Sequence, residues 1–472
     1  MPFFRGLLIE ENGDNNLMKF FTSRSQVSHE MLGTEPVNKL LFKMATPSVI
    51  AMIMQALYNS VDSMFVAKVS SESLAAVTLA FPVSMLIGAL STGIGVGINS
   101  CISRHLGAKD EKSASIAAAN GMLLGLASVV IMIIFGLVAP EFYLSLYTDD
   151  PLVMENGIIY IRTISLLAFG TIFVQISFSI LQGSGNMIIP MISQIVGGLL
   201  VIALDPLFIF AFKLNILGAA LASSLAQIIA MGIGMYGIFV KNKANLPISK
   251  GDFRPNGVII KDILAVGIPS ALTQATTSIV SGIISKIIAG YGTAAVSVFG
   301  GYSKFSTFGI LPVFGVTRGM NPILGYSIGA GDKDRFIATE KIAIMVASVI
   351  SGVTGLVFLL FPSLILNFIS ATPEMEQIGM TAYRILALPL FVNGASIVMS
   401  QVFPPAKKSY LTTIYTMLRQ IAIMIPLCLL GGNLWGMNGV WIGYAMTDYM
   451  AFIVVIIMTI WFRKKVLNEL GK

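Results

Sequence analysis

Long apolar segments, separated by short polar breaks, follow one another along the chain from Leu40 onward. Each segment is long enough to cross the hydrocarbon core of a bilayer as an α-helix, which takes about 20 residues. The pattern therefore predicts an all-α integral membrane protein with twelve transmembrane helices. We expect these helices at 40–67, 74–103, 113–138, 158–181, 187–212, 217–240, 259–289, 294–325, 336–361, 378–403, 409–431 and 438–462.

Composition supports the same class. Apolar residues make up 55% of the chain and charged residues 11%, whereas about a quarter of the residues in a soluble domain are charged. A net charge of +7 would suggest nucleic acid as the partner of a soluble chain, but here the basic residues fall in polar breaks on one side of the predicted topology. We therefore expect a lipid bilayer around the protein and no nucleic-acid partner.

The residues that usually build metal or redox sites are few. Cys101 and Cys428 fall on opposite predicted membrane faces, which excludes a disulfide framework. His29 and His105 have no ligand partners at metal-binding spacing. The chain has no Walker-type loop, so ATP is not expected to drive it. We expect no cofactor, no metal centre and no enzymatic activity, because a membrane-embedded enzyme would need clustered catalytic residues or metal ligands at a membrane face.

The basic residues set the predicted orientation. The side opposite to the termini retains only Lys68 and Lys213 among the lysines and arginines of the loops, and its longer loops carry acids such as Asp150 and Glu374. Since basic loops stay in the cytoplasm, both termini are predicted to be cytoplasmic. The cytoplasmic side then collects Arg104, Lys109, Lys112, Lys241, Lys243, Lys250, Arg254, Lys261, Lys333, Arg335, Lys341, Lys407, Lys408, Arg463, Lys464, Lys465 and Lys472.

Short segments of the first half recur in the second half at a constant distance of 220 to 222 residues. Four such pairs indicate a duplication, and the six intervening helices leave both copies in the same orientation, an arrangement that places substrate between the halves. The pairs are TPS (46–48) with IPS (268–270), HLGAKD (105–110) with SIGAGD (327–332), DPLFIF (205–210) with IPLCLL (425–430), and ILGAALASS (216–224) with MNGVWIGYA (437–445). We predict a cytoplasmic tail at 1–38, an N-lobe at 39–240, a cytoplasmic linker at 241–258, a C-lobe at 259–463 and a second cytoplasmic tail at 464–472.

Asp205 is the only charged residue between Met187 and Phe212. An ionised carboxylate near the centre of a bilayer costs about 3 kcal/mol, so such a residue faces protein or a water-filled cavity. Pro206 lacks an N–H group, which leaves the Ile202 carbonyl free to turn toward a cation or water. Two interpretations remain open: a carboxylate that binds a proton or cation during transport, or a proline kink whose carboxyl group is hydrogen-bonded to a neighbouring helix.

Asp62 lies well inside the first predicted helix, where Gln55 and Tyr58 precede it at i−7 and i−4 and form one polar stripe. The alternative is an aspartate at the helix end that faces the outer interface near Lys68. The second half carries isoleucine at the repeat positions of both aspartates, Ile425 for the fifth helix and Ile283 or Ile284 for the first. Carboxylates in only one half suggest a cation site in the N-lobe.

The seventh predicted helix has Gln274, Ser278, Ser281 and Ser285 at i, i+4, i+7 and i+11, which places them on one face. Serine also serves as a small residue for close helix packing in membranes. This stripe therefore either lines a cavity or packs against a neighbouring helix.

The chain resembles the multidrug and toxic compound extrusion (MATE) family over nearly its whole length, from about Leu32 to Lys465. The resemblance is carried by SRHLGAKD (103–110), GMNPILGYSIGAGD (319–332) with the following KDR, and LDPLFIF followed by LGAALASS. It implies a V-shaped pair of six-helix lobes in a prokaryotic plasma membrane. It also implies export of bulky, amphipathic and often cationic drug-like compounds by a monomer, against inward flow of H⁺ or Na⁺.

The resemblance extends to individual residues. Tyr58 and Asp62 match a tyrosine–aspartate pair of the prokaryotic branch that houses its cation site in the N-lobe, and Asp205 matches that branch's fifth-helix aspartate. Ser223 stands where the branch usually has threonine, and Val201 where it usually has asparagine. We expect Asp205, Asp62, Tyr58 and Ser223 to form the cation-coupling site, which would hold H⁺ or Na⁺.

The fourth helix departs from the family pattern, because its usual polar position is Phe178, with Gln175 one turn away. The resemblance and the polar stripes together suggest a substrate cavity lined by Gln55, Gln175, Gln274, Ser278 and Ser281. The alternative function is a flippase for lipid-linked precursors, of the wider superfamily to which MATE proteins belong. That function would require a cationic cavity for pyrophosphate, whereas the charged residues predicted inside the N-lobe helices are acidic. A channel is disfavoured by the single pair of lobes.

Overall fold

The computed structural model describes residues 29–67, 69, 71–242 and 246–467. Residues 1–28 of the predicted tail at 1–38 lie outside this part of the chain. The same holds for residues 243–245 of the predicted linker at 241–258 and residues 468–472 of the predicted tail at 464–472. Within the described residues the protein is helical and contains no strand.

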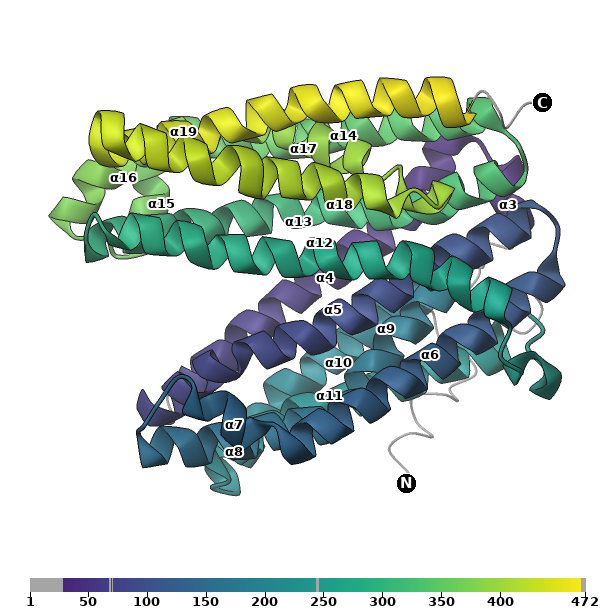
Figure 1. Ribbon diagram of the computed structural model, residues 1–472, viewed down its shortest axis with the longest axis horizontal. Coiled ribbons are helices and arrows are strands. Elements are labelled where there is room, and N and C mark those ends of the chain that lie inside the picture. The colour runs from purple at the N-terminus through teal and green to yellow at the C-terminus, as the bar shows by residue number, and fades with distance from the viewer. Residues whose placement is uncertain (1–28, 68, 70, 243–245, 468–472) are drawn as a thin grey trace, which may run out of the picture.

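The helices form two bundles that follow one another along the sequence (Figure 1). The first bundle contains α3 (His29–Thr34), α4 (Val37–Ala67), α5 (Ser71–Gly107), α6 (Glu111–Val138), α7 (Pro140–Ser145), α8 (Pro151–Leu166), α9 (Ala168–Gly183), α10 (Ile188–Pro206), η1 (Leu207–Ala211), α11 (Asn215–Tyr236) and η2 (Gly237–Lys241). After η3 (Lys250–Phe253), the second contains α12 (Gly257–Ala289), α13 (Thr293–Gly329), α14 (Lys333–Leu360), α15 (Pro362–Phe368), α16 (Pro373–Ala387), α17 (Leu390–Ser400), η4 (Pro404–Ala406), α18 (Ser409–Met417), η5 (Leu418–Met424), α19 (Ile425–Phe462) and η6 (Arg463–Leu467).

These helices confirm the twelve predicted spans. Eight segments are long and apolar enough to cross a membrane, and two bent pairs, α8 with α9 and α16 with α17, make two more spans with bends of 42° and 46°. The segment from Ser409 to Lys465 leaves helical geometry at Trp435 and Gly436 and therefore holds two spans. The more polar α13, with 37 residues, is the remaining span.

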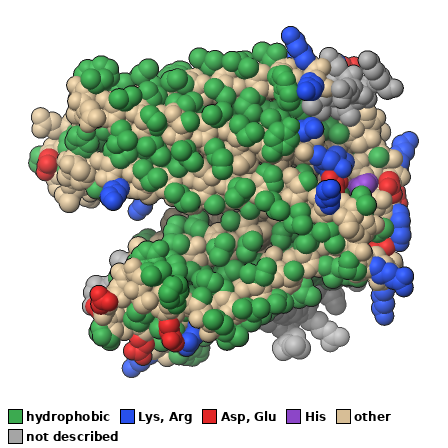
Figure 2. All heavy atoms as spheres, in the orientation of Figure 1, with side chains coloured by type: hydrophobic (Ala, Val, Ile, Leu, Met, Phe, Trp, Pro, Cys, Tyr) green, Lys and Arg blue, Asp and Glu red, His purple; other side chains and the backbone are tan. Residues whose placement is uncertain are grey.

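The two bundles meet at one end and diverge at the other, which gives the V shape that the family resemblance implies (Figure 1). Figure 2 shows the open groove between them, with basic side chains gathered at the end where the bundles meet. Apolar side chains are spread over both bundles on the face shown in Figure 2, as expected for a surface that faces lipid. We call the bundle before the linker the N-lobe and the one after it the C-lobe.

Glycines allow the two lobes to touch backbone to backbone. A Cβ atom on Gly93 of α5 would lie 2.7 Å from the carbonyl oxygen of Gly267 in α12, and one on Gly319 of α13 would lie 2.7 Å from the Ala45 nitrogen in α4. Any larger residue would push these helix pairs apart. The contacts α5–α12 and α4–α13 therefore depend on small residues, as is usual between membrane helices.

Charged side chains join the lobes at their closed end. Asp262 of α12 pairs with Arg104 of α5 at 2.9 Å and with Lys407, just after η4, at 2.8 Å. Arg104 also donates to the carbonyl of Pro405 at 3.0 Å. Because the side chains of Arg104 and Asp262 are each only 9% exposed, this cluster holds one N-lobe helix against two elements of the C-lobe.

The connection between the lobes is tied to α6. Asp252 of η3 accepts hydrogen bonds from Lys112 and from the backbone and side chain of Ser249, and Asn120 accepts from the Asn256 N–H at 2.8 Å. Burial raises the pKa of Asp252, but these hydrogen bonds outweigh it and bring the pKa below its usual value. The stabilisation from this carboxylate is therefore present above the usual carboxyl pKa and is lost as the pH falls through the lowered value.

Asp262→Asn should destabilise the protein by about 3 kcal/mol, because removing one partner of a buried ion pair leaves the other charge uncompensated. Glu141→Gln is the matched control. It removes a pair with Arg162 of similar length, 2.8 Å, whose side chains are 68% and 44% exposed, and such pairs contribute less than about 1 kcal/mol. Thermal unfolding of the purified proteins in detergent measures both effects, and equal melting temperatures for the two variants would contradict the proposed lobe-joining role.

Candidate functional site

Asp205 lies at the end of α10 with its side chain fully buried. Neither of its carboxylate oxygens has a hydrogen-bond partner among the described residues, although its carboxyl group interacts with that of Asp62 from α4. A buried polar group without a partner is rare in folded proteins and calls for a ligand, an ion or a proton to explain it. In the described part of the chain, the group of a neighbouring helix with which the Asp205 carboxyl interacts by hydrogen bonding is the Asp62 carboxyl of α4, and a hydrogen bond between two carboxyl groups requires a proton between them.

The helix does not end at Pro206. Pro206 keeps helical geometry (φ −63°, ψ −32°), and the chain continues directly into the π-helix η1, where the Phe212 N–H donates to the Leu207 carbonyl at 2.9 Å. π-helical turns in α-helices occur frequently at functional sites. The chain thus changes helix type directly after Asp205 and Pro206.

The structure brings Asp62, Asp205 and Ser223 together. The Ser223 hydroxyl, from α11, donates to Asp62 Oδ1 at 3.4 Å. Tyr160 of α8 lies within electrostatic range of both carboxyl groups. The site is thus built from α4, α8, α10 and α11, all of the N-lobe.

Tyr58 lies one turn before Asp62 and is also buried. Its hydroxyl accepts a hydrogen bond from Gln194 Nε2 at 3.5 Å, and Gln55 and Gln227 are further partners. Val201, which replaces the family's asparagine, packs against Tyr58 in a small apolar cluster. The ring of Tyr58 therefore joins a polar cluster to an apolar one.

Three residues of this site were missed from the sequence. Gln194 could have been found, because Gln194, Val201 and Asp205 lie at i, i+7 and i+11 on one face of α10. Gln227 follows Ser223 by one turn of α11 and carries the same kind of signal. Tyr160 has no signal in the sequence, since it lies on a helix with no other member of the site.

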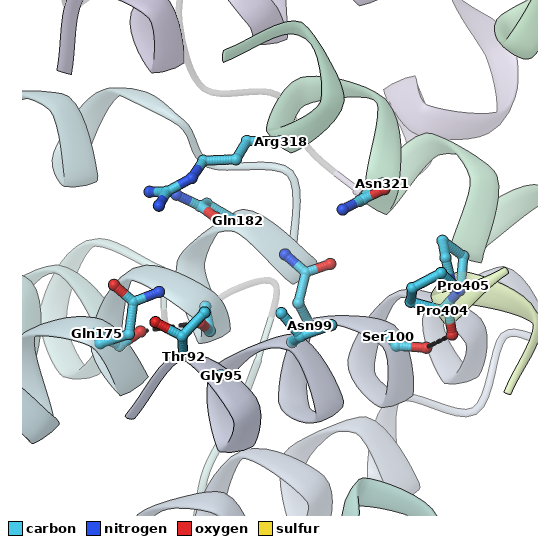
Figure 3. A pocket seen from close by; sticks show the side chains of 12 residues that line it. Thr92, Gly95, Asn99, Ser100, Gln175, Gln182, Arg318, Asn321, Pro404 and Pro405 are labelled. Carbon is cyan, nitrogen blue, oxygen red and sulfur yellow. Dashed lines mark hydrogen bonds between the residues drawn. The ribbon is translucent and has the colours of Figure 1, made fainter. Parts of the chain in front are cut away.

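The five residues predicted for the substrate cavity do not line one cavity. Gln55 lines a small cavity with Gln182 and Arg318, and Gln175 lines an adjoining cavity that shares both of those residues (Figure 3). The other three predicted residues lie on α12. Gln274 and Ser278 line an apolar cavity of about 330 Å³ between α5 and α12, and Ser281 lines a cavity of about 350 Å³ within the C-lobe.

The C-lobe cavity carries a neutralised charge. Arg419 lines it and pairs with Asp448 at 2.6 Å, and the Asp448 side chain is 5% exposed. This cavity therefore offers hydroxyl and amide groups together with an arginine whose charge is already compensated.

The fold also brings together one set of potential metal ligands. Atoms of Cys101, His105 and Asp262 lie within 4.8 Å of one another, a juxtaposition that the sequence spacing did not reveal. However, each oxygen of Asp262 already pairs with a cation, Arg104 or Lys407. The group is therefore an ion-pair cluster rather than a suitable metal site.

The MatE family model matches residues 47–207 and 269–430, one match in each lobe. The multidrug export protein MepA of Staphylococcus aureus (strain MSSA476) is 24% identical over 408 residues, which cover 86% of this chain and 89% of that protein. The FAD transporter of Shewanella oneidensis is 21% identical over 427 residues, which cover 88% of this chain and 92% of that protein.

Solved structures give the same picture. A MATE protein crystallised with MaL6 has a TM-score of 0.89 at 27% identity, covering 94% of this chain and all of that chain. A second structure is a transporter of the MOP superfamily from Pyrococcus furiosus, described as having a binding pocket of reversed polarity. Its TM-score is 0.88 at 28% identity, covering 95% of this chain and all of that chain. Since the family model covers well over half of the sequence, the chain belongs to the MatE family of multidrug and toxic compound extrusion transporters.

Proposed function

We propose that the protein is a secondary active efflux transporter that exports amphipathic organic compounds in exchange for H⁺ or Na⁺. The observation that carries this proposal is the buried carboxyl group of Asp205, which faces a second carboxyl group, that of Asp62, in one lobe of a two-lobed membrane protein. The related proteins named above export drugs or transport FAD, which supports organic compounds as the cargo.

The chemistry of the aspartate pair suits a coupling ion. Two carboxylates side by side in an apolar medium repel each other, so a shared proton or a bound cation lowers their free energy. Ser223 and Tyr58 add hydroxyl oxygens close by, and oxygen ligands suit a hard cation such as Na⁺. We assign Asp205, Asp62, Tyr58 and Ser223 to this site, with Gln194, Gln227 and Tyr160 around it.

Helix α4 connects this site to the groove. It packs against α10 in the N-lobe and against α13 in the C-lobe, and it carries both Asp62 and Tyr58. A cation drives transport only if it binds the two conformations of the transporter with different affinity. Neutralising the aspartates would allow α4 and α10 to approach each other, and the resulting shift of α4 would alter its contact with the C-lobe.

The distribution of basic residues supports one orientation of the protein in the membrane. The basic residues gather where the lobes meet (Figure 2), and basic loops stay in the cytoplasm. We propose a monomer in a prokaryotic plasma membrane, with both termini in the cytoplasm and the groove open to the outside.

Asp205→Asn should insert normally, still bind an organic cation and lose nearly all gradient-driven export, since asparagine keeps the size of the side chain but cannot titrate. Export is measured in proteoliposomes with H⁺ and Na⁺ gradients imposed separately, which also identifies the coupling ion. Asp149→Asn, at an exposed carboxylate, is the matched control and should export like the wild type. Export by Asp205→Asn at the wild-type rate under either gradient would show that this carboxylate is structural.

The proposed topology is tested by reporter fusions. A reporter placed after Lys250 or after Lys408 should score cytoplasmic, and one placed after Asp150 should score external. A cytoplasmic score at Asp150 would reverse the orientation of the N-lobe and place the opening of the groove on the inside.

A further inference from the structure

Arg318 of α13 lines two adjoining cavities, both of which reach into the N-lobe. Figure 3 shows its guanidinium group above Gln182 of α9, with Asn99 of α5 and Asn321 of α13 around the same space. A side chain of the C-lobe thus extends its charge into a space walled mainly by N-lobe helices.

The charge of Arg318 is not compensated. No carboxylate of the described residues forms an ion pair with it, and no acidic residue lines either cavity. Three other arginines within or at the ends of the spans are paired with acids: Arg104 with Asp262, Arg419 with Asp448 and Arg463 with Glu340. Arg384 of α16, for which no ion pair is found among the described residues, is exposed. An ionised side chain in a membrane span is costly and usually marks a functional site, so the unpaired Arg318 is a candidate binding group.

The surroundings of Arg318 are rich in hydrogen-bond donors. The amides of Asn99, Gln175, Gln182 and Asn321 line the same cavity, and no hydrogen bond from their side chains is found among the described residues. Gln182 is 9% exposed. A guanidinium group and four free amides suit a group that accepts several hydrogen bonds and carries negative charge.

The size of the space limits what can enter. The cavity shown in Figure 3 has a volume of about 70 Å³, several times the roughly 10–15 Å³ of cavity volume that one water molecule needs. A carboxylate or phosphate group fits such a space, whereas a complete drug-sized molecule does not. The apolar body of the compound would then remain in the groove, where α5 and α12 border an apolar cavity of about 330 Å³.

We propose that Arg318, with Gln182 and the neighbouring amides, binds the acidic group of a transported compound, so that the protein carries zwitterionic and anionic amphipathic compounds. This rests on the proposed export function and specifies its substrate class. Arginine holds a carboxylate or a phosphate by two parallel hydrogen bonds, which a lysine at the same position does not reproduce.

Two matched pairs of fluorescent probes test the proposal: a rhodamine with a free carboxylate against its methyl ester, and flavin mononucleotide against riboflavin. Binding to the purified full-length protein is followed by fluorescence polarisation without any ion gradient. The wild type should bind at least one acidic probe more tightly than its uncharged counterpart, and the pair that shows the preference tells carboxylate from phosphate.

Arg318→Gln should weaken binding of the preferred acidic probe by roughly tenfold or more, the range for hydrogen bonds to charged groups, and leave the counterpart nearly unchanged. Arg318→Lys should bind the acidic probe more weakly than the wild type and more tightly than Arg318→Gln. Gln182→Leu, which changes the N-lobe side of the cavity, should show the same selective loss as Arg318→Gln. Lys304→Gln removes a positive charge from an exposed position on the same helix that lines neither cavity, and it should bind both probes like the wild type.

Three results would overturn the proposal: a wild type with no preference for either acidic probe, equal weakening of both members of a pair by Arg318→Gln, or the same selective loss in Lys304→Gln. Because binding is measured without a gradient, its outcome is separate from that of the export assay. Acid-selective binding without gradient-driven export would contradict the proposed export function and leave the Arg318 site intact.

Discussion

A charge buried in an apolar medium needs a counter-charge, a proton or a ligand, and this requirement organises the protein. Most ionised side chains within the spans meet it inside the protein: Arg104 with Asp262, Arg419 with Asp448 and Arg463 with Glu340. These pairs lie where the lobes meet or inside the C-lobe, and they hold helices together. Among the groups that no such ion pair compensates, we assign the aspartates of the N-lobe and Arg318 to transported species.

The two unpaired groups have opposite sign and lie close to one helix. The aspartates lie between α4 and α10, whereas Arg318 extends from α13, and α4 packs against both α10 and α13. Gln55 and Gln194 line the cavity of Arg318, and both are partners of the Tyr58 hydroxyl. A cation at Asp62 and an acidic group at Arg318 would therefore act on side chains in contact with each other, which gives exchange of ion and cargo a short physical route.

Close backbone contacts make such an exchange a movement of whole helices. Gly93 lies against Gly267, and Gly319 against Ala45, so at these two contacts the lobes meet backbone to backbone. Gly198 lets α10 approach Tyr58, whose ring a Cβ atom there would meet at 2.9 Å. Small residues at these contacts let packed helices shift against one another by small sliding motions.

The sequence by itself determined the class, the twelve spans and the aspartates as candidates, because helix length, apolar periodicity and the cost of a buried charge are properties of a single segment. Tertiary structure alone decided which faces meet. It placed Tyr160 beside the aspartates, separated Gln55 and Gln175 from Gln274, Ser278 and Ser281, and left Arg318 unpaired. Such contacts join residues far apart in the chain and depend on the rotation and tilt of each helix, which no local pattern specifies.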